Sequence, residues 1–189
     1  MLEARDRAVA PTGSLSIDSR RSRLTFEVRY FGVLRVQGAF RTMRGEIQGL
    51  DPRAPSATTV TAVVPISSLD TGIRFRDWHL SSRGYLSVRR YPEATFLSER
   101  IVPNGPGSAR VLGALTLRGV TREVVLHVNE CRFDEAQRRM RARAYFTVRR
   151  SDFAVGPPRR VPWWDVRRYL IDDEVRLVLD LEAVEGSEH

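Results

Sequence analysis

The sequence predicts an all-β fold, an antiparallel barrel of about eight strands with a short helical insertion around residues 67–90. Apolar and polar residues alternate through most of the 189-residue chain, which is typical of strands with one buried face. Short runs of glycine, proline and polar residues separate these stretches and favour antiparallel connections. The alternation is lost between residues 67 and 91, where one or two helical turns are expected.

The strands can be placed in chain order by their apolar faces. The first clear run puts Leu24, Phe26, Val28 and Tyr30 on one face. The same period of two recurs at 60–66, 111–117, 124–128, 140–148 and 175–181. Turn signals fall at 49–55, 103–107, 118–120 and 134–139. We expect one domain over residues 14–184, with flexible ends at 1–13 and 185–189.

The interior of such a barrel is either filled by side chains or holds one small ligand. Periodicity alone does not separate these two cases. Four positions on the predicted inward face carry small residues, which favours some open space: Ala62, Gly113, Ala142 and Ala144.

The formal net charge is +8, and all 31 basic residues are arginine, because the chain contains no lysine. Arginine pairs bidentately with carboxylates and phosphates, so a basic surface would attract nucleic acid, anionic lipid or an acidic headgroup. The arginine pairs are spread along the chain with acids between them, which is typical of a solvated surface. Charge alone does not choose among these partners.

The chain has one cysteine, Cys131, so an intrachain disulfide is excluded. A quiet, partly buried thiol is expected there. The N-terminal residues MLEARDRAVAPTG carry charges where a signal peptide would need an apolar run of about 7 to 15 residues, so we expect a cytoplasmic protein. No stretch approaches the roughly 20 apolar residues of a membrane-spanning helix.

Ordered motifs across residues 15–183 resemble the YceI-like family. The opening LSIDSRRSRLTFEVRYFGVLRVQGAFRTMRGEI is similar to the first hairpin of that family, and RDWHL at 76–80 resembles its most specific element. Tyr91-Pro92 followed by TFLS, then GALTLRGVTREVVLHV, continue the match. The last similar segments are Arg150 with Asp152-Phe153, and the strand that begins at Asp173. The chain departs from the family pattern at Leu15, Arg21, Gly84 and Ala154, none of which removes a strand.

The resemblance implies a lipocalin-like barrel whose apolar interior binds a long lipid, such as a polyisoprenoid, an isoprenoid quinone or a fatty-acid derivative. Such a protein sequesters or carries its ligand and is not an enzyme. A bound lipid is therefore expected as ligand, with no other cofactor. Many members of this family are periplasmic, so the expected cytoplasmic location of this protein departs from theirs.

Two groups of residues are candidates for the ligand site. The inward-facing group would line the cavity: Phe26, Val28, Phe40, Phe96, Leu115, Leu117, Phe146 and Phe153. The second group lies outside the alternating runs and would form the mouth or contact a headgroup: Arg76, Asp77, Trp78, His79, Tyr85, Trp163 and Trp164. For both groups the alternative is a purely structural role, as core packing or as a turn held by Arg76 and Asp77. The segment 156–170 is a candidate cap for one mouth of the barrel.

No catalytic or metal-binding residues are expected. Asp77, His79 and Ser81 or Ser82 lie close in sequence, but triad members normally converge from separate segments and no G-x-S-x-G elbow is present. The histidines are few, and His127 alternates with apolar residues on a strand, which indicates a solvent-facing or hydrogen-bonded side chain.

The alternative function is an adaptor whose arginine-rich surface binds nucleic acid or an anionic membrane. The lipid carrier is the favoured hypothesis, and no nucleic-acid partner is expected. Transient contact with a membrane surface and a homodimer are further partners that the sequence leaves open. In a homodimer, outward Arg141 and Arg143 would pair with acids across the interface.

Overall fold

The computed structural model describes residues 13–50, 57–157 and 171–185. Its strands are β1 (Leu15–Ile17), β2 (Arg23–Tyr30), β3 (Leu34–Phe40), β4 (Arg44–Gln48), β5 (Thr59–Pro65), β6 (Leu69–Asp70), β7 (Glu93–Pro103), β8 (Ala109–Leu117), β9 (Val120–Asp134), β10 (Arg139–Arg149) and β11 (Ile171–Glu185). The one α-helix of the described residues is α1 (Arg74–Ser81), and short 3-10 helices cover Ile66–Ser68 and Arg150–Phe153. The predicted tail from residue 185 begins one residue early, because Glu185 belongs to β11.

The strands form a closed antiparallel barrel of eight strands, as the sequence predicts. The closed ring runs β1-β4-β5-β7-β8-β9-β10-β11 and returns from β11 to β1. On β11, beyond the part that pairs with β1, the hairpin β2–β3 and the two-residue β6 extend the wall. Each strand of the closed ring therefore has a partner on both sides, which removes the exposed sheet edges that promote aggregation. Outside the ring, β3 pairs with β6 only through Ala39 and Phe40.

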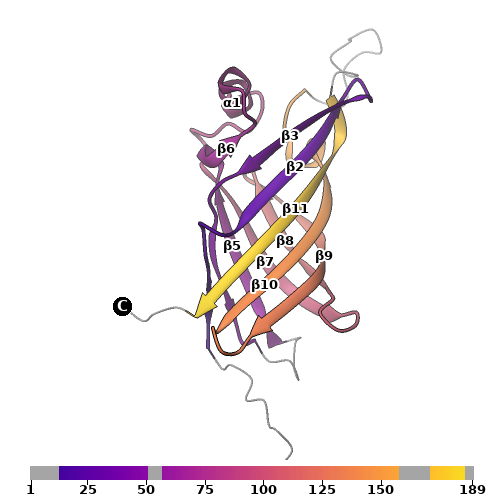
Figure 1. Ribbon diagram of the computed structural model, residues 1–189. Helices are drawn as coiled ribbons and strands as arrows, with labels where there is room; N and C mark the ends of the chain where they lie inside the picture. Colours follow the sequence, from indigo (N-terminus) through magenta and orange to yellow (C-terminus); the bar gives the residue numbers. More distant parts are fainter. Residues whose placement is uncertain (1–12, 51–56, 158–170, 186–189) are drawn as a thin grey trace, which may run out of the picture.

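Strand β11 divides its free edge between two partners (Figure 1). Residues 171–180 pair with β2, and residues 183–185 pair with β1. The chain bends between these two strands, and Ser22 bridges the break. Its hydroxyl donates to the Glu182 carbonyl at 3.1 Å and accepts from the Glu182 N–H at 3.0 Å. The Glu182 carbonyl also accepts from the Asp18 main-chain N–H at 2.8 Å, so the buried Ser22 hydroxyl supplies the partner of the Glu182 N–H and a second donor to the carbonyl.

The two ends of the barrel differ. Helix α1 and the β2–β3 turn lie at one end, which we call the α1 end (Figure 1). The β7–β8 and β9–β10 turns lie at the other, which we call the far end. The β8–β9 turn has positive φ at Arg118 (53°) and Gly119 (72°), the conformation of a two-residue hairpin turn. This turn is the bend predicted at 118–120.

Four groups of buried apolar residues fill parts of the interior. The largest lies in the middle of the barrel and contains Val111, Leu126, Ala144, Phe146 and Leu177. A second, with Ile66, Leu69 and Leu86, lies under the segment that follows α1. Within the described residues, no helix has the length and hydropathy needed to cross a membrane.

Replacing Ser22 by alanine tests the closure. The substitution removes the acceptor of the buried Glu182 N–H, so the free energy of unfolding should fall by about 1–3 kcal/mol. Urea unfolding followed by circular dichroism measures this change. Ser16→Ala, a half-buried serine of β1, is the matched control and should stay within about 0.5 kcal/mol of the parent. Equal losses of stability in both variants would show that the Ser22 hydrogen bonds do not stabilise the junction of β11 with β1 and β2.

Candidate functional site

An apolar cavity of about 530 Å³ extends from the middle of the barrel to the far end. Its size falls within the usual range for small-molecule sites, about 300–1,000 Å³. Phe96, Val111 and Leu179 border its inner part, and the β7–β8 turn, residues 105–108, borders its far end. The remaining wall is almost entirely apolar: Ile47, Leu50, Thr58, Val60, Ala62, Ile101, Pro103, Ala109, Leu126, Val128, Cys131, Phe133, Met140, Ala142, Ala144 and Leu181.

Small inward residues leave part of this space open. Ala62, Ala142 and Ala144, which the sequence indicates as small inward positions, all border the cavity. Gly113 acts differently. A Cβ at this position would lie 2.7 Å from the Phe96 ring and would overlap the Leu97 carbonyl oxygen. The ring therefore occupies the room that Gly113 leaves, and this glycine adds no cavity space.

Two β-bulges decide which side chains reach the cavity. The β7–β8 register shifts between Ser98 and Arg100, so Phe96 and Ile101 both face inward although they lie five positions apart, an odd step that would place them on opposite faces of a regular strand. In β9, Glu130 has a positive φ of 56°, and the register with β10 shifts beside it. Cys131 thereby borders the cavity together with Val128.

The predicted cavity residues lie at different depths. Phe96 borders the 530 Å³ cavity, and Phe26, Leu115 and Phe146 belong to the packed group in the middle of the barrel. Phe40 and Leu117 pack nearer α1, around Ile66 and Leu69. The other two predicted residues differ in burial: Val28 is half-buried on β2, and Phe153 is 1% exposed in the 3-10 helix after β10.

The predicted cavity residues are mainly aromatic, whereas most of the cavity wall consists of smaller apolar residues outside that set. Val60, Leu126 and Leu181 lie in the alternating runs, so their inward face was predictable even though they were not chosen. Ile101 and Cys131 follow bulges, and no simple period of two identifies them.

At the α1 end, Arg76 and Asp77 both bind Thr71. The Asp77 carboxylate accepts hydrogen bonds from the Thr71 main-chain N–H at 2.9 Å and from its hydroxyl at 2.5 Å. Arg76 donates to the Thr71 hydroxyl at 2.8 Å and to its carbonyl at 2.6 Å. These contacts fix the start of α1, which accounts for a structural part of the RDWHL motif.

A polar group faces the barrel interior beside this turn. Tyr30, at the inner face of β2, lies near Tyr85, Arg76 and Arg150, and its pKa is raised mainly by burial and next by Tyr85. Tyr30 therefore remains a neutral phenol that can donate a hydrogen bond. The ring of Tyr85 lies 4.7 Å from that of His79. Arg150 is buried and donates to the carbonyls of four residues, Val155, Pro157, Ile171 and Asp172.

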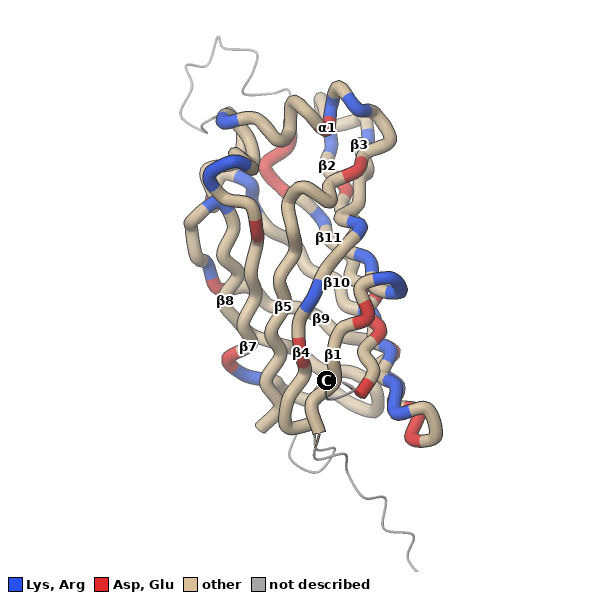
Figure 2. Tube along the Cα trace, turned by 90° about the vertical axis from the view of Figure 1, so that its left-hand side faces the viewer, with Lys and Arg blue, Asp and Glu red and all other residues tan. Residues whose placement is uncertain are grey.

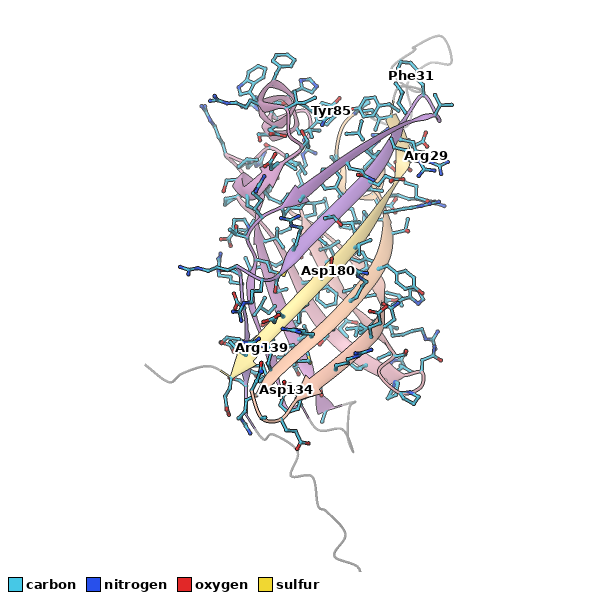
Figure 3. All side chains as sticks on the ribbon, viewed as in Figure 1. Arg29, Phe31, Tyr85, Asp134, Arg139 and Asp180 are labelled. Atoms are coloured by element: carbon cyan, nitrogen blue, oxygen red, sulfur yellow. The ribbon has the colours of Figure 1, made fainter. Side chains whose placement is uncertain are left out.

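The other predicted mouth residues do not join this polar group. Trp78 is 68% exposed and contacts Phe75 on the outer side of α1. Trp163 and Trp164, with most of the segment 156–170, lie outside the described residues. Figure 3 shows Tyr85 and Phe31 at one end of the barrel and Asp134 and Arg139 at the other.

Many outward arginines of β10 and its turns are paired within the chain. Arg141 donates to Glu182 at 3.0 Å, and Arg143 donates to Asp180 at 2.6 Å. Arg138 pairs with Glu185. Acids of the neighbouring strand β11 thus pair with Arg141 and Arg143 within one chain, and the pairing of these arginines across a dimer interface stays a prediction.

The described residues show no cluster of three or more histidine, cysteine, aspartate or glutamate side chains that would hold a metal. Ser81 donates to the main-chain carbonyl of Asp77, not to His79. His127 is exposed and stacks on Tyr145 at 5.2 Å on the outer face of the barrel.

Cys131 provides a chemical test of the cavity wall. Burial raises the pKa of this thiol, so less thiolate is present at neutral pH than in a free cysteine. We expect iodoacetamide to react slowly with the folded chain, with a midpoint in the rate–pH profile above that of the same cysteine in urea. Mass spectrometry of timed samples gives both profiles. Coincident profiles would contradict the buried position.

The comparisons with known proteins agree with this geometry. The family model described as a YceI-like domain matches residues 15–183. UPF0312 proteins of Yersinia pestis and Yersinia enterocolitica are 34% identical over 119 residues, 63% of this chain and 61% of each relative. The matched part thus spans less than two thirds of these relatives.

Solved structures share the fold. BcnA of Burkholderia cenocepacia superimposes with a TM-score of 0.78 and 23% identity, over 89% of this chain and 99% of that one. A polyisoprenoid binding domain from Saccharophagus degradans gives 0.67 and 16%, over 91% and 98%. Family model, relatives and barrel geometry lead to one conclusion: the chain belongs to the YceI-like family.

Proposed function

We propose that this protein binds one long apolar lipid inside the barrel and sequesters or carries it without changing it chemically. The observation that carries this proposal is the 530 Å³ cavity with its almost wholly apolar wall. Burial of an apolar chain needs no reactive group, and each methylene removed from water contributes about 0.8 kcal/mol.

Half-buried valines beyond the cavity support a ligand site that is longer than the cavity itself. Between the cavity and the α1 end, Val28, Val36, Val148 and Val175 belong to the inward faces of their strands, yet they are only half-buried. Inward residues of a filled barrel would be fully buried. Their partial exposure supports contact between these valines and the part of a flexible chain that extends beyond the cavity.

The ligand class follows from this shape. A long narrow apolar space suits a polyisoprenoid, the tail of an isoprenoid quinone or a fatty-acid derivative, and the related structure from Saccharophagus degradans is named as a polyisoprenoid binding domain. We assign the polar end of the ligand to the α1 end, where the hydroxyls of Tyr30 and Tyr85 can donate hydrogen bonds and Arg76 and Arg150 add positive charge. Drug-sized ligands gain about 0.3 kcal/mol per heavy atom, so about 30 such atoms give sub-micromolar affinity.

Native mass spectrometry of the purified protein tests the proposal directly. We expect an added mass that organic extraction releases as a prenyl, quinone or acyl lipid. If the protein carries only its own mass, titration with geranylgeraniol, a short-chain ubiquinone and palmitate should restore a complex. A clean apoprotein that takes up none of the three would show that the barrel is not a lipid carrier.

Filling the cavity should weaken lipid binding. Ala142 is half-buried at the cavity wall, so Ala142→Phe places a ring in the space that the lipid needs. We expect the affinity for geranylgeraniol, measured by displacement of a fluorescent fatty acid, to fall at least about tenfold. Thr147→Phe adds the same ring at an exposed outward position of the same strand and should bind like the parent. Thermal unfolding of both variants checks that each is folded, and equal affinities would place the ligand elsewhere.

A further inference from the structure

The large apolar side chains that face solvent are concentrated at the α1 end. Eight large apolar residues are strongly exposed among those the structure describes, and only Leu97 and Tyr145 lie on the barrel wall. The other six lie on two projections at the α1 end: Phe31, Val33 and Leu34 on the β2–β3 turn, and Ile73, Phe75 and Trp78 on or beside α1. Both projections stand at the same end in Figure 1. We call these six residues the apolar rim.

The residues of the apolar rim are little buried by the rest of the fold. Helix α1 has no buried residue, whereas a short helix normally depends on packing of its apolar face. Phe75 and Trp78 are instead 74% and 68% exposed and contact each other. In the β2–β3 turn, Phe31 has a φ of 53°, a conformation that costs free energy for a bulky residue, and its ring is 59% exposed. Apolar side chains that stay exposed, one of them on a backbone conformation that costs free energy, indicate a binding surface.

Arginine surrounds the rim. Residues 29–35 and 73–83 contain five arginines and one acid, Asp77, whose carboxylate is held by Thr71. Arg29 and Arg35 stand opposite each other in the β2–β3 pair, an unfavourable placement of like charges. Within the described part of the chain, Arg29, Arg74 and Arg83 form no ion pair, in contrast to the paired arginines of β10. Figure 2 shows basic positions in blue around α1.

We propose that the apolar rim docks on the surface of a bilayer that contains anionic phospholipids, with the side chains of the two projections inserted between headgroups and the arginines on the phosphates. Apolar tips ringed by basic residues match both layers of such an interface, the acyl boundary and the negative headgroups. A second copy of this chain fits less well, because two rims would bring five arginines against five. This inference adds a membrane surface to the proposed carrier and does not depend on the cavity.

The test is cosedimentation of the full chain with vesicles made of two parts phosphatidylcholine and one part phosphatidylglycerol. The parent should sediment with these vesicles. Val33→Ser/Phe75→Ser removes the most exposed residue of each projection and should weaken binding at least about tenfold. Leu97→Ser/Tyr145→Ser removes two exposed apolar residues of the barrel wall and should bind like the parent. Failure of the parent to sediment, or equal losses in both double variants, would overturn the proposal.

The charge contribution is tested separately. Arg29→Gln/Arg74→Gln should weaken binding to the anionic vesicles about fivefold for each arginine, and should not change any residual binding to pure phosphatidylcholine. An equal effect on both vesicle types would contradict a role for the headgroup charge.

Two further measurements separate this proposal from others. Sedimentation velocity reports self-association: a parent that dimerises and a Val33→Ser/Phe75→Ser variant that stays monomeric would identify the rim as a self-interface and overturn membrane docking. Geranylgeraniol binding in solution should be unchanged in the same variant. Lost vesicle binding with intact geranylgeraniol binding supports the rim, and the absence of geranylgeraniol binding in the parent counts against the carrier alone.

Discussion

The barrel depends on the way in which β11 closes it. This strand must pair with β10 on one side and with two different strands on the other, because the chain bends between β1 and β2. At the bend, the Ser22 hydroxyl bonds to both main-chain groups of Glu182, and the Asp18 N–H also donates to the Glu182 carbonyl. The Glu182 side chain is nearly buried and carries ion pairs from Arg21, Arg139 and Arg141. One short stretch of sequence thus joins the start of the chain to its last strand, and the closed wall around the cavity follows from that junction.

The closed wall explains how an open interior is tolerated. The strand pairs satisfy the main-chain hydrogen bonds of the wall whether or not side chains fill the interior. The wall is therefore stable without complete packing inside it. Small residues such as Ala142 then leave room, and the bulges in β7 and β9 turn Ile101 and Cys131 toward it. A bulge adds local twist to a strand, so the same irregularities that shape the wall also select what faces the ligand.

The fold could be predicted from the sequence to the extent that its strands alternate. The runs that contain Phe26, Leu115 and Phe146 were long enough to reveal their period, and the helical insertion was found where the period fails. Strands β1 and β6, of three and two residues, are too short to show a period. The cavity was harder to predict, because its wall depends on bulges and on which of many inward residues lack a neighbour across the barrel. The exposed rim could not be predicted, since a sequence does not show which turn lacks a covering segment.

The polar group of Tyr30, Tyr85, Arg76 and Arg150 lies at the same end of the barrel as the exposed apolar tips. A lipid held with its polar end there would exchange with a membrane without carrying that end through an apolar region. Its headgroup would stay in the hydrated boundary between protein and membrane, and only the tail would move from the bilayer core into the barrel. The largest barrier to moving such a molecule, the dehydration of its head, would then be absent from the route, and the speed of exchange would depend on how freely the tail reverses direction.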